Sequence, residues 1–454
     1  MNKYAAALDL GCGKVALAVG EQTSSGIRIV SYHDAPSVGI EYGEIVNDMK
    51  VEELVRSLVS QTEAELQEKI DRVTVGLSGR GIHCIDDPEQ VTRPNPQAYI
   101  TDEEVNRIIR KRFEENPGNG EQVFEAIPQR YGTEDRIGIT RDELVGMLGR
   151  QIDVDFKLFL GRRTLLERRR FILRNCGLAV DRAILSPIAS ARAVLSNPEM
   201  ENGVALVDMG RNSTEVAIVK DNIVRYVAVI PFGGESITGD IKNVAGITRD
   251  WAEILKIKHG RCCAEYAVEN KKLLLKNENE AIDGEMEISL LVRTVEARLS
   301  EIFDAVRYVI EQSGYASKLT SGIVITGGVC HHEDFIQLAN AMLGQKVRLA
   351  APQGSIDSSS VEDAFDVYAS TAVGLVLETL DPMLSHTDVR SGVTAGAGPE
   401  TGAGNGTIFG DDPDAVPGER PSGKKKRGKE KKEKEDKGHS TSFWGNLFSD
   451  NDKA

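Results

Sequence analysis

The sequence predicts an α/β fold built from two similar halves that face each other across a cleft. Short strands alternate with amphipathic helices along most of the chain, which is typical of mixed α/β domains. The organisation of ALDLGCGKVALAVGEQTSSGIRIVSY near the N-terminus recurs in LVDMGRNSTEVAIVKDNIVRYVAVI, which begins at Leu206. In both, an apolar strand ends in Asp-x-Gly and a tight turn leads to two further strands, so the chain contains an internal duplication.

The first half is expected to contain three short strands within residues 4–31, separated by glycine turns. A helical pattern in VEELVRSLVSQTEAELQEKI and a strand in RVTVGLSG follow. The same half resumes later in the chain with a helix in RTLLERRRFILRNCG, a strand in RAILS and a helix in PIASARAVL.

The composition changes between residues 85 and 161, where loops that contain proline separate the elements. A helix is expected to open at Thr101, with Glu104 completing a capping box. Strands are expected near QVFEAIPQRY and QIDVDFKLFLG. We interpret this segment as a small inserted α/β domain.

After the repeated unit, the pattern predicts helices in ESITGDIKNVAG and RDWAEILKIKHG and a long helix within 288–313. The strand and turn GIVITGG precede a helix at EDFIQLANAML, a strand at KVRLAAP and a helix at EDAFDVYASTAVGLVLE. From residue 379 onward the periodicity disappears and Gly, Pro, Thr, Asp and Lys predominate. Because this composition buries too little apolar area to offset its ordering entropy, we expect a disordered linker.

Composition narrows the classes of function. The chain has 454 residues, is 40% hydrophobic and carries a formal charge of -15, which argues against a nucleic-acid-binding protein. Its six cysteines are scattered without a C-x-x-C pair, as expected in a reducing, intracellular compartment. The apolar N-terminus is interrupted by Asp9 and Lys14, so we expect a protein that is neither exported nor membrane-spanning.

Two turns carry the residue types of a phosphate-binding site. Such a site needs backbone N–H groups that point into a glycine-containing turn, and a nearby carboxylate that holds Mg²⁺ through its waters. One Asp-x-Gly turn alone is most often a plain hairpin, but two in matching contexts, with a later TGG, are a stronger signal. The candidate residues are Asp9, Gly11, Gly13, Lys14, Asp208, Gly210, Asn212, Ser213, Gly327 and Gly328.

The chain resembles the FtsA family of bacterial cell-division proteins, which belongs to the actin-like ATPase superfamily. The resemblance runs from about residue 4 to 378 and includes LVDMGRNSTEVAIV; its specific motifs are VIPFGGESITGDI, AEILKIKHGRC, VEARLSEIFDAV, GIVITGG and STAVGL, in that order. It implies an actin-like (ribonuclease H-like) duplicated fold around a nucleotide cleft, with the inserted domain in place of the second actin subdomain.

The resemblance also implies a division of the chain into domains. The parts are the first half (1–84 and 162–198), the inserted SHS2-like domain (85–161), the second half (199–240 and 319–378), its smaller subdomain (241–318), the disordered linker (379–442) and a membrane-targeting amphipathic helix (443–450).

The resemblance further implies how ATP and Mg²⁺ are bound. Asp9 to Lys14 would form the first phosphate loop and Asp208 to Ser213 the second, with Asp9 and Asp208 facing the metal and Asp208 as the catalytic residue. Other positions would surround the nucleoside: Gly233 and Gly234 below it, Glu253 and Lys256 beside the adenosine, and Gly327 with Gly328 closing the pocket. From spacing alone, Glu253 and Lys256 could equally form a solvated helix face.

Two departures from the superfamily pattern affect turnover. Arg211 and Asn212 stand where the second phosphate turn usually has glycines. Ser186 and Pro187 stand where related enzymes often carry an acidic residue or Gln that orients the attacking water. We therefore expect a nucleotide-gated switch with at most slow ATP hydrolysis. A metal site at Cys330, His331 and His332 is disfavoured, because adjacent side chains do not converge on one ion.

The C-terminal end combines a basic run with an apolar stripe. From residue 424 to 437, nine Lys and Arg oppose four Asp and Glu, a local net of +5. On a helix, Phe443, Trp444, Leu447 and Phe448 fall on one face. This combination is typical of segments that bind anionic membrane surfaces, although docking on the protein's own body or on a partner's groove is the alternative.

These features, taken with the resemblance, imply a peripheral protein on the cytoplasmic face of the inner membrane at midcell. It would bind ATP, polymerise with itself, anchor FtsZ filaments (the Z-ring) and recruit later division proteins. The FtsZ C-terminal tail would dock on residues 241–318. A sugar or acid kinase is the main alternative, since the fold alone does not define function. A DnaK-type chaperone would need a further folded domain after residue 378.

Overall fold

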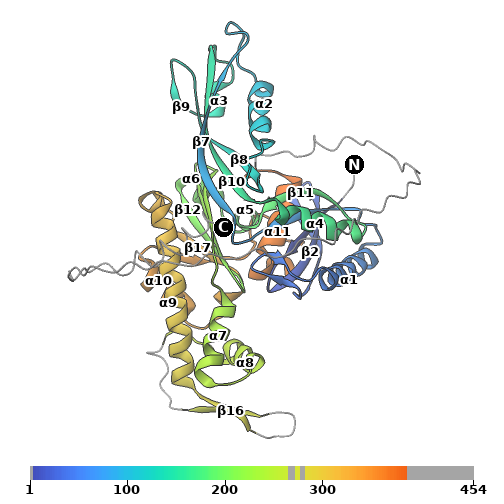
Figure 1. Cartoon of the computed structure of the whole chain (residues 1–454), viewed down its shortest axis with the longest axis vertical. Helices are drawn as coiled ribbons and strands as arrows, with labels where there is room; N and C mark the ends of the chain where they lie inside the picture. Colours follow the sequence, from blue (N-terminus) through green and yellow to red (C-terminus); the bar gives the residue numbers. More distant parts are fainter. Residues whose placement is uncertain (1–3, 264–270, 277–281, 386–454) are drawn as a thin grey trace, which may run out of the picture. The chain divides into compact units, whose positions relative to one another are not determined.

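The computed structural model describes residues 4–263, 271–276 and 282–385, all within one compact unit. Two five-stranded sheets carry the two halves of the predicted duplication (Figure 1). The first has the order β11-β6-β1-β2-β3. Its strands are β1 (Ala5–Leu10), β2 (Lys14–Thr23), β3 (Gly26–Pro36), β6 (Arg72–Leu77) and β11 (Ala179–Leu185).

The second sheet has the order β14-β13-β12-β17-β18, which repeats the first strand for strand. In both sheets the first strand pairs antiparallel with the next strand of the chain and parallel with a later one. Its strands are β12 (Val204–Met209), β13 (Thr214–Lys220), β14 (Ile223–Ile230), β17 (Ile323–Thr326) and β18 (Val347–Leu349). The duplicated α/β fold is confirmed, and Asp9 and Asp208 occupy equivalent positions one residue before their strands end.

Apolar helices pack between and around the sheets. Helices α5 and α11 lie side by side; α11 also contacts β1, and α5 contacts β12 (Figure 1). The bounds are α1 (Asp48–Leu66), α4 (Arg163–Asn175), α5 (Ser186–Val194), α6 (Asn197–Asn202), α10 (Phe335–Leu343) and α11 (Ser370–Leu380). Eight of the nine residues of α5 are buried, so this helix forms part of the core on all sides.

A separate antiparallel sheet, β7-β10-β8-β9, corresponds to the predicted insertion and extends slightly beyond 85–161. Its elements are β7 (His83–Thr92), α2 (Asp102–Phe113), β8 (Glu121–Gly132), β9 (Ile137–Ile139), α3 (Arg141–Leu144) and β10 (Gln151–Arg162). Thr101 caps α2 as predicted, but the capping box is wrong. Glu104 instead receives the buried Arg93 guanidinium at 2.9 and 3.0 Å, because a buried cation needs a carboxylate partner.

The elements after the second repeat include the region predicted to be the smaller subdomain (241–318). Helix α7 packs against α8 and α9 (Figure 1), and the hairpin β15/β16 was not predicted. These elements are α7 (Gly234–Ala245), α8 (Arg249–His259), β15 (Lys272–Lys276), β16 (Ile282–Glu287) and α9 (Ile288–Gln312). The helix predicted over 362–378 was partly wrong, since two 3-10 turns (Glu362–Phe365 and Val367–Ala369) precede α11.

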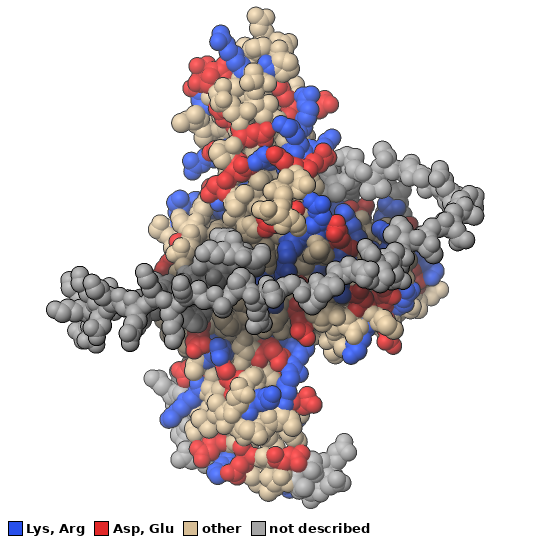
Figure 2. Space-filling view, in the orientation of Figure 1, with Lys and Arg blue, Asp and Glu red and all other residues tan. Residues whose placement is uncertain are grey.

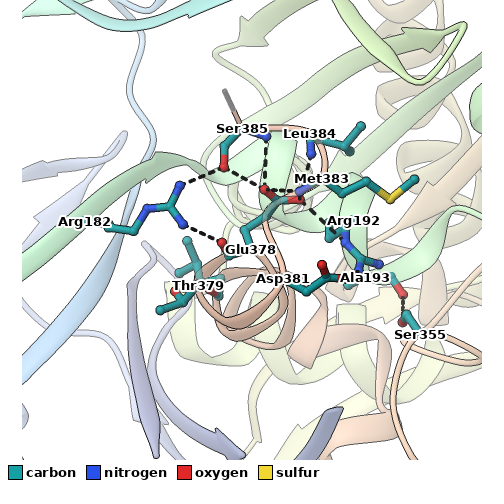
Figure 3. A network of polar contacts seen from close by, with 11 residues as sticks. Arg182, Arg192, Ala193, Ser355, Glu378, Thr379, Asp381, Met383, Leu384 and Ser385 are labelled. Carbon is teal, nitrogen blue, oxygen red and sulfur yellow. Dashed lines mark hydrogen bonds and ion pairs between the residues drawn. The ribbon is translucent and has the colours of Figure 1, made fainter. Parts of the chain in front are cut away.

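The described chain continues in an ordered form past the predicted start of the linker at residue 379. The Glu378 carboxylate is fully buried and accepts hydrogen bonds from the backbone N–H groups of Met383, Leu384 and Ser385 (Figure 3). Arg182 donates at 2.6 Å to the Glu378 backbone carbonyl. The boundary at 379 is therefore wrong by seven residues, because this buried acceptor holds the chain down through Ser385. The rest of the predicted linker and the helix at 443–450 lie outside the described residues.

Candidate functional site

A cleft of about 460 Å³ separates the two repeated strand-turn-strand units. We call it the central cleft. Of the predicted nucleotide-site residues, it is lined by Asp9, Gly11, Gly13, Lys14, Asp208, Gly210, Asn212, Ser213, Gly234, Glu253, Lys256, Gly327 and Gly328. Residues from five separate segments of the sequence thus come together in one cleft.

Gly233 is the exception, since it does not line the cleft. A Cβ atom on Gly233 would lie 2.4 Å from the Gly210 carbonyl oxygen and 2.7 Å from that of Arg211. The residue is small because the start of α7 presses against the second Asp-x-Gly turn. Its role is to let two backbone segments approach, which is structural and not contact with a ligand.

The first turn is closed by its own backbone. A Cβ atom on Gly11 would lie 2.8 Å from the Lys14 carbonyl oxygen, so only glycine fits the turn without a shift. The Lys14 ammonium donates to Asp34 at 2.8 Å and also to the Tyr32 hydroxyl. Lys14 lines the cleft and is held by partners on β3 of its own half.

The second turn is closed in the same manner, with the Gly210 N–H donating to the Ser213 carbonyl at 2.9 Å. Behind it stands Gly327, whose φ of +93° and close approach both require glycine. A Cβ atom at Gly327 would lie 2.5 Å from Asp208 Oδ1. The TGG turn therefore packs directly against the Asp208 carboxylate, a contact that was not predicted from the sequence.

Asp208 is positioned by the two core helices. Its Oδ2 accepts a hydrogen bond from Ser190 on α5 at 2.8 Å and lies 3.5 Å from Thr371 on α11. Burial raises the pKa of Asp208, although these hydroxyl groups partly oppose the shift. The interaction with Ser190 and Thr371 was not predicted, because the three residues are far apart in the sequence.

A third carboxylate, Glu215, joins Asp9 and Asp208 in the cleft and was missed in the sequence. Burial raises the pKa of Asp9 to about 6, and burial with repulsion from Asp208 raises the pKa of Glu215 to about 8. Glu215 pairs with Asp208 across β12 and β13 and binds the Ser78 hydroxyl from the other half. The signal was available, because residues that pair across an antiparallel hairpin such as β12/β13 place their side chains on the same face of the sheet.

These carboxylates suit a hydrated magnesium ion better than a direct metal cage. Among the described residues, no group of three His, Cys, Asp or Glu side chains is arranged to hold a metal, and this includes the region of Cys330, His331 and His332. Mg²⁺ usually keeps several waters and is held by one or two carboxylates together with phosphates. Burial is the main cause of the raised pKa values of Asp9 and Glu215, and a cation bound beside phosphates would oppose that shift.

Glu253 and Lys256 lie in the cleft wall, which makes the alternative of a solvated helix face wrong. Lys256 is 8% exposed and donates to Glu253 at 2.8 Å and to the Gly234 carbonyl at 3.1 Å. Burial opposes the charge of Glu253, but hydrogen bonds from Lys256 and Thr238 outweigh it and lower the pKa. The pair therefore presents fixed charges at one end of the cleft.

The neighbouring cleft residues also include a stacked aromatic pair and a hydroxyl. The His331 and Tyr368 rings stack with centroids 4.7 Å apart, and Tyr368 covers the turn at Gly328. Ser186 lines the cleft, in agreement with the prediction that the joint ILSPIAS offers no acidic group there.

The described surface gives two further observations. On the face drawn in Figure 2, acidic and basic side chains are interspersed over the described residues, without the continuous basic area that a polyanion needs. Among residues 4–263, 271–276 and 282–385, no helix has both the length and the apolarity needed to cross a bilayer.

Two similar halves, each with an Asp-x-Gly turn at a shared cleft, define an actin-like fold. A solved structure with this fold, a PilM-PilN type IV pilus biogenesis complex, matches 83% of the chain and 99% of its own chain with a TM-score of 0.58 and 16% identity. The family model for cell division protein FtsA matches residues 205–374. Over this stretch the chain is similar to the FtsA family of cell division proteins.

Curated relatives extend the match over most of the chain. The cell division protein FtsA of Neisseria meningitidis serogroup B is 28% identical over 379 residues, 83% of this chain and 90% of that protein. FtsA of Escherichia coli K12 is 28% identical over 408 residues, 87% of this chain and 95% of that protein. The similarity therefore includes both halves and the insertion, and is not confined to the stretch that the family model matches.

Proposed function

We propose that the protein binds ATP with Mg²⁺, polymerises on the cytoplasmic face of the inner membrane at midcell and anchors FtsZ filaments there. The observation that carries the proposal is the convergence of both Asp-x-Gly turns and the TGG turn on one cleft, in a chain that is similar to the FtsA family. Turn backbone and fixed carboxylates are what a magnesium-bound triphosphate requires. Glu253 and Lys256 would then flank the nucleoside.

The membrane and partner contacts of the proposal come from the sequence. A basic run and the stripe of Phe443, Trp444, Leu447 and Phe448 would hold the chain peripherally on anionic lipid. The FtsZ C-terminal tail would dock on the smaller subdomain at 241–318, where Val244, Leu274 and Leu290 are 49%, 52% and 42% exposed. Once assembled, the filament would recruit later division proteins.

Hydrolysis is proposed to be slow. Among the described residues, Glu215 supplies the carboxylate that would act as a catalytic base beside the phosphates of a bound nucleotide. Its pKa of about 8 leaves it mostly protonated at neutral pH, and in that form it does not act as a base. The same carboxylate is the one observation that favours a small-molecule kinase. A panel of sugars and small acids with ATP should yield no phosphorylated product; rapid transfer to any of them would replace the division-protein proposal.

Asp208→Ala tests the site directly. Because Asp208 would face the metal and act as the catalytic residue, we expect at least about a tenfold loss of Mg-ATP affinity and a matching loss of nucleotide-dependent assembly. Titration of ATP with and without Mg²⁺, followed by pelleting of polymers, measures both. The matched control is Asp381→Ala, whose carboxylate is 65% exposed and lies outside the cleft lining. Unchanged affinity and polymers in Asp208→Ala would remove the second turn from the site.

A further inference from the structure

Arg211 occupies a position in the second turn where related proteins usually have glycine, and its backbone is locked to helix α7. The Gly234 N–H donates to the Gly210 carbonyl at 3.0 Å, and the Glu235 N–H donates to the Arg211 carbonyl at 2.7 Å. The turn and the first residues of α7 therefore move as one piece. Any force on this turn acts directly on the smaller subdomain.

The Arg211 side chain lies along the cleft and against the first turn. A Cβ atom on Gly13 would lie 3.4 Å from Arg211 Cβ and 4.0 Å from its Cδ, so the side chain bridges the space between the two Asp-x-Gly turns. Arg211 lines the cleft, whereas Glu235 is absent from its described lining. The arginine is thus the cation of the second turn that a polyphosphate between the turns would meet.

Two arginines share one carboxylate at the cleft edge. Arg211 Nε donates to Glu235 Oε2 at 3.1 Å, and Arg249 Nε donates to Glu235 Oε1 at 2.7 Å, with a second Arg249 contact to Oε2. The side chains of Arg211, Glu235 and Arg249 are 34%, 29% and 42% exposed. Ion pairs this accessible to water are weak and exchange readily, and Glu235 keeps a partner when either arginine leaves.

We propose that Arg211 is a triphosphate-sensing residue, which exchanges Glu235 for the terminal phosphate of a nucleotide in the central cleft. The proposal rests on the proposed ATP binding and adds a specificity-determining contact to it. A guanidinium binds phosphate through two parallel, charge-assisted hydrogen bonds, which a half-exposed pair with a shared carboxylate does not match. Arg249 then retains Glu235 alone.

The other cations of the cleft make this exchange necessary for charge balance. Of the three Lys and Arg residues among its described lining, Lys14 is held by Asp34 and Lys256 by Glu253. The cleft also contains the buried carboxyl groups of Asp9 and Asp208, whose ionised forms repel an anion. Arg211 is the cation on the second turn that can offset a terminal phosphate.

The exchange would transmit nucleotide state to the smaller subdomain. Glu235 lies in the first turn of α7 and Arg249 begins α8, so the triad joins the phosphate turn to both helices. With a diphosphate, Arg211 would stay on Glu235, which would then bind both arginines. With a triphosphate, Arg211 would leave and Glu235 would bind Arg249 alone, while the backbone bonds keep α7 on the turn, which gives two discrete side-chain arrangements that a ligand can select.

Three variants with opposite expected signs test the exchange by equilibrium binding of Mg-ATP and Mg-ADP to the full chain. Glu235→Gln removes the competitor and should tighten Mg-ATP about three- to tenfold while changing Mg-ADP little. Arg249→Gln leaves Glu235 entirely to Arg211 and should weaken Mg-ATP. Arg211→Gly should weaken Mg-ATP about tenfold and abolish the gain from Glu235→Gln when the two changes are combined.

Arg211→Lys keeps a charge without the planar fork and should fall between wild type and Arg211→Gly, which preserves the test if the glycine variant does not fold. If the ion pair is purely structural, Glu235→Gln should weaken the binding of both nucleotides equally. This result would overturn the inference about Arg211 but not the proposed function. Wild-type protein that binds neither nucleotide would overturn the proposed function together with the inference.

Discussion

The Glu215 carboxyl group is buried between Asp9 and Asp208, and its ionisation is unfavourable in the folded protein. Its folded-state pKa of about 8 lies above the ordinary value of 4.5. A raised pKa means that the stabilisation is complete below the unfolded value and is lost as pH rises through about 8. Without metal or nucleotide, the free energy of unfolding should therefore fall between these two values.

Glu215→Gln should remove this pH dependence, because the amide cannot ionise and still accepts the Ser78 hydroxyl hydrogen bond. We expect the stability gained by the substitution to grow by on the order of 2 kcal/mol between about pH 6 and about pH 9. Asp9, with its pKa of about 6, titrates in both proteins, so its contribution cancels in the difference between their free energies of unfolding. Urea unfolding at the two pH values measures the difference; an equal gain at both would contradict a buried, repelled carboxyl group.

At the scale of single residues, the turn residues could be predicted from the sequence, but contacts between residues far apart in the chain could not. Asp9, Gly11, Asp208 and Gly210 could be found because an Asp-x-Gly turn is a local signal that repeats in the chain. The partners that hold Asp208, namely Ser190 and Thr371, have ordinary local contexts and meet it only through the packing of α5 and α11.

At the scale of elements, the turn after β17 is the most constrained backbone of the site. Gly327→Ala would introduce a Cβ atom 2.5 Å from Asp208 Oδ1 at a residue with φ of +93°. We expect a loss of at least about 2 kcal/mol in stability and loss of Mg-ATP binding, since steric overlap adds to backbone strain. Chemical denaturation and nucleotide titration measure both effects.

Gly314→Ala is the matched control for that change. Gly314 also has a positive φ, +72°, but nothing lies within 4 Å of its Cβ position. It should lose only about 1 kcal/mol from strain and bind nucleotide normally. Equal losses in the two variants would show that the approach to Asp208 is not what requires Gly327.

A second element that can be tested is the clasp at the end of α11, in which the Glu378 carboxylate accepts hydrogen bonds from the backbone of Met383, Leu384 and Ser385. Glu378→Ala would leave the buried N–H groups of Leu384 and Ser385 and the part-buried one of Met383 without their acceptor, and Arg192 without a carboxylate 3.6 Å away. The expected loss of unfolding free energy is about 3 kcal/mol. Asp381→Ala removes an exposed partner of the same Arg192 and should change stability by less than about 0.5 kcal/mol. Comparable losses in both variants would refute the clasp.

Helices and strands were predicted correctly where buried residues recur at regular spacing. They were predicted wrongly where exposure or local hydrogen bonds determine the structure. The strands of the two five-stranded sheets and α1, α4, α7, α8 and α9 were predicted from apolar patterns, whereas β7 and β9 of the inserted sheet were not predicted. The β15/β16 hairpin is mostly exposed, so it lacks the buried alternation that reveals a strand. The helix expected over 362–378 is broken at Asp366, whose side chain accepts the Tyr368 N–H and stabilises a 3-10 turn.

At the scale of the whole molecule, the internal repeat predicted the two halves and the cleft between them. The division into subdomains stays a prediction, as do the membrane and FtsZ contacts. Four large apolar side chains at 443–448 would bind lipid weakly as single copies, because ordering and immobilisation offset most of the burial energy. The predicted linker over 379–442 would reach ~40 to 50 Å if it behaves as a flexible coil. The apolar ends of several subunits of one filament could then insert into the membrane together.

Changes in the tail separate its two contributions to membrane binding. Trp444→Glu with Phe448→Glu should abolish flotation with anionic vesicles while leaving ATP binding intact, because the apolar stripe is lost. Charge reversal across 424–432 should weaken flotation in a salt-dependent manner without abolishing it. Flotation that is equally strong after both changes would favour docking of the tail on protein.

Vesicle flotation with a labelled peptide of the FtsZ C-terminal tail tests the central claim most directly. The full chain with Mg-ATP should carry the peptide to the floating fraction, whereas protein that lacks residues 441–454 should bind ATP and peptide but remain at the bottom with both. A full-length chain that floats without the peptide, or a truncated chain that floats as well as the full one, would contradict the account of a membrane anchor for FtsZ.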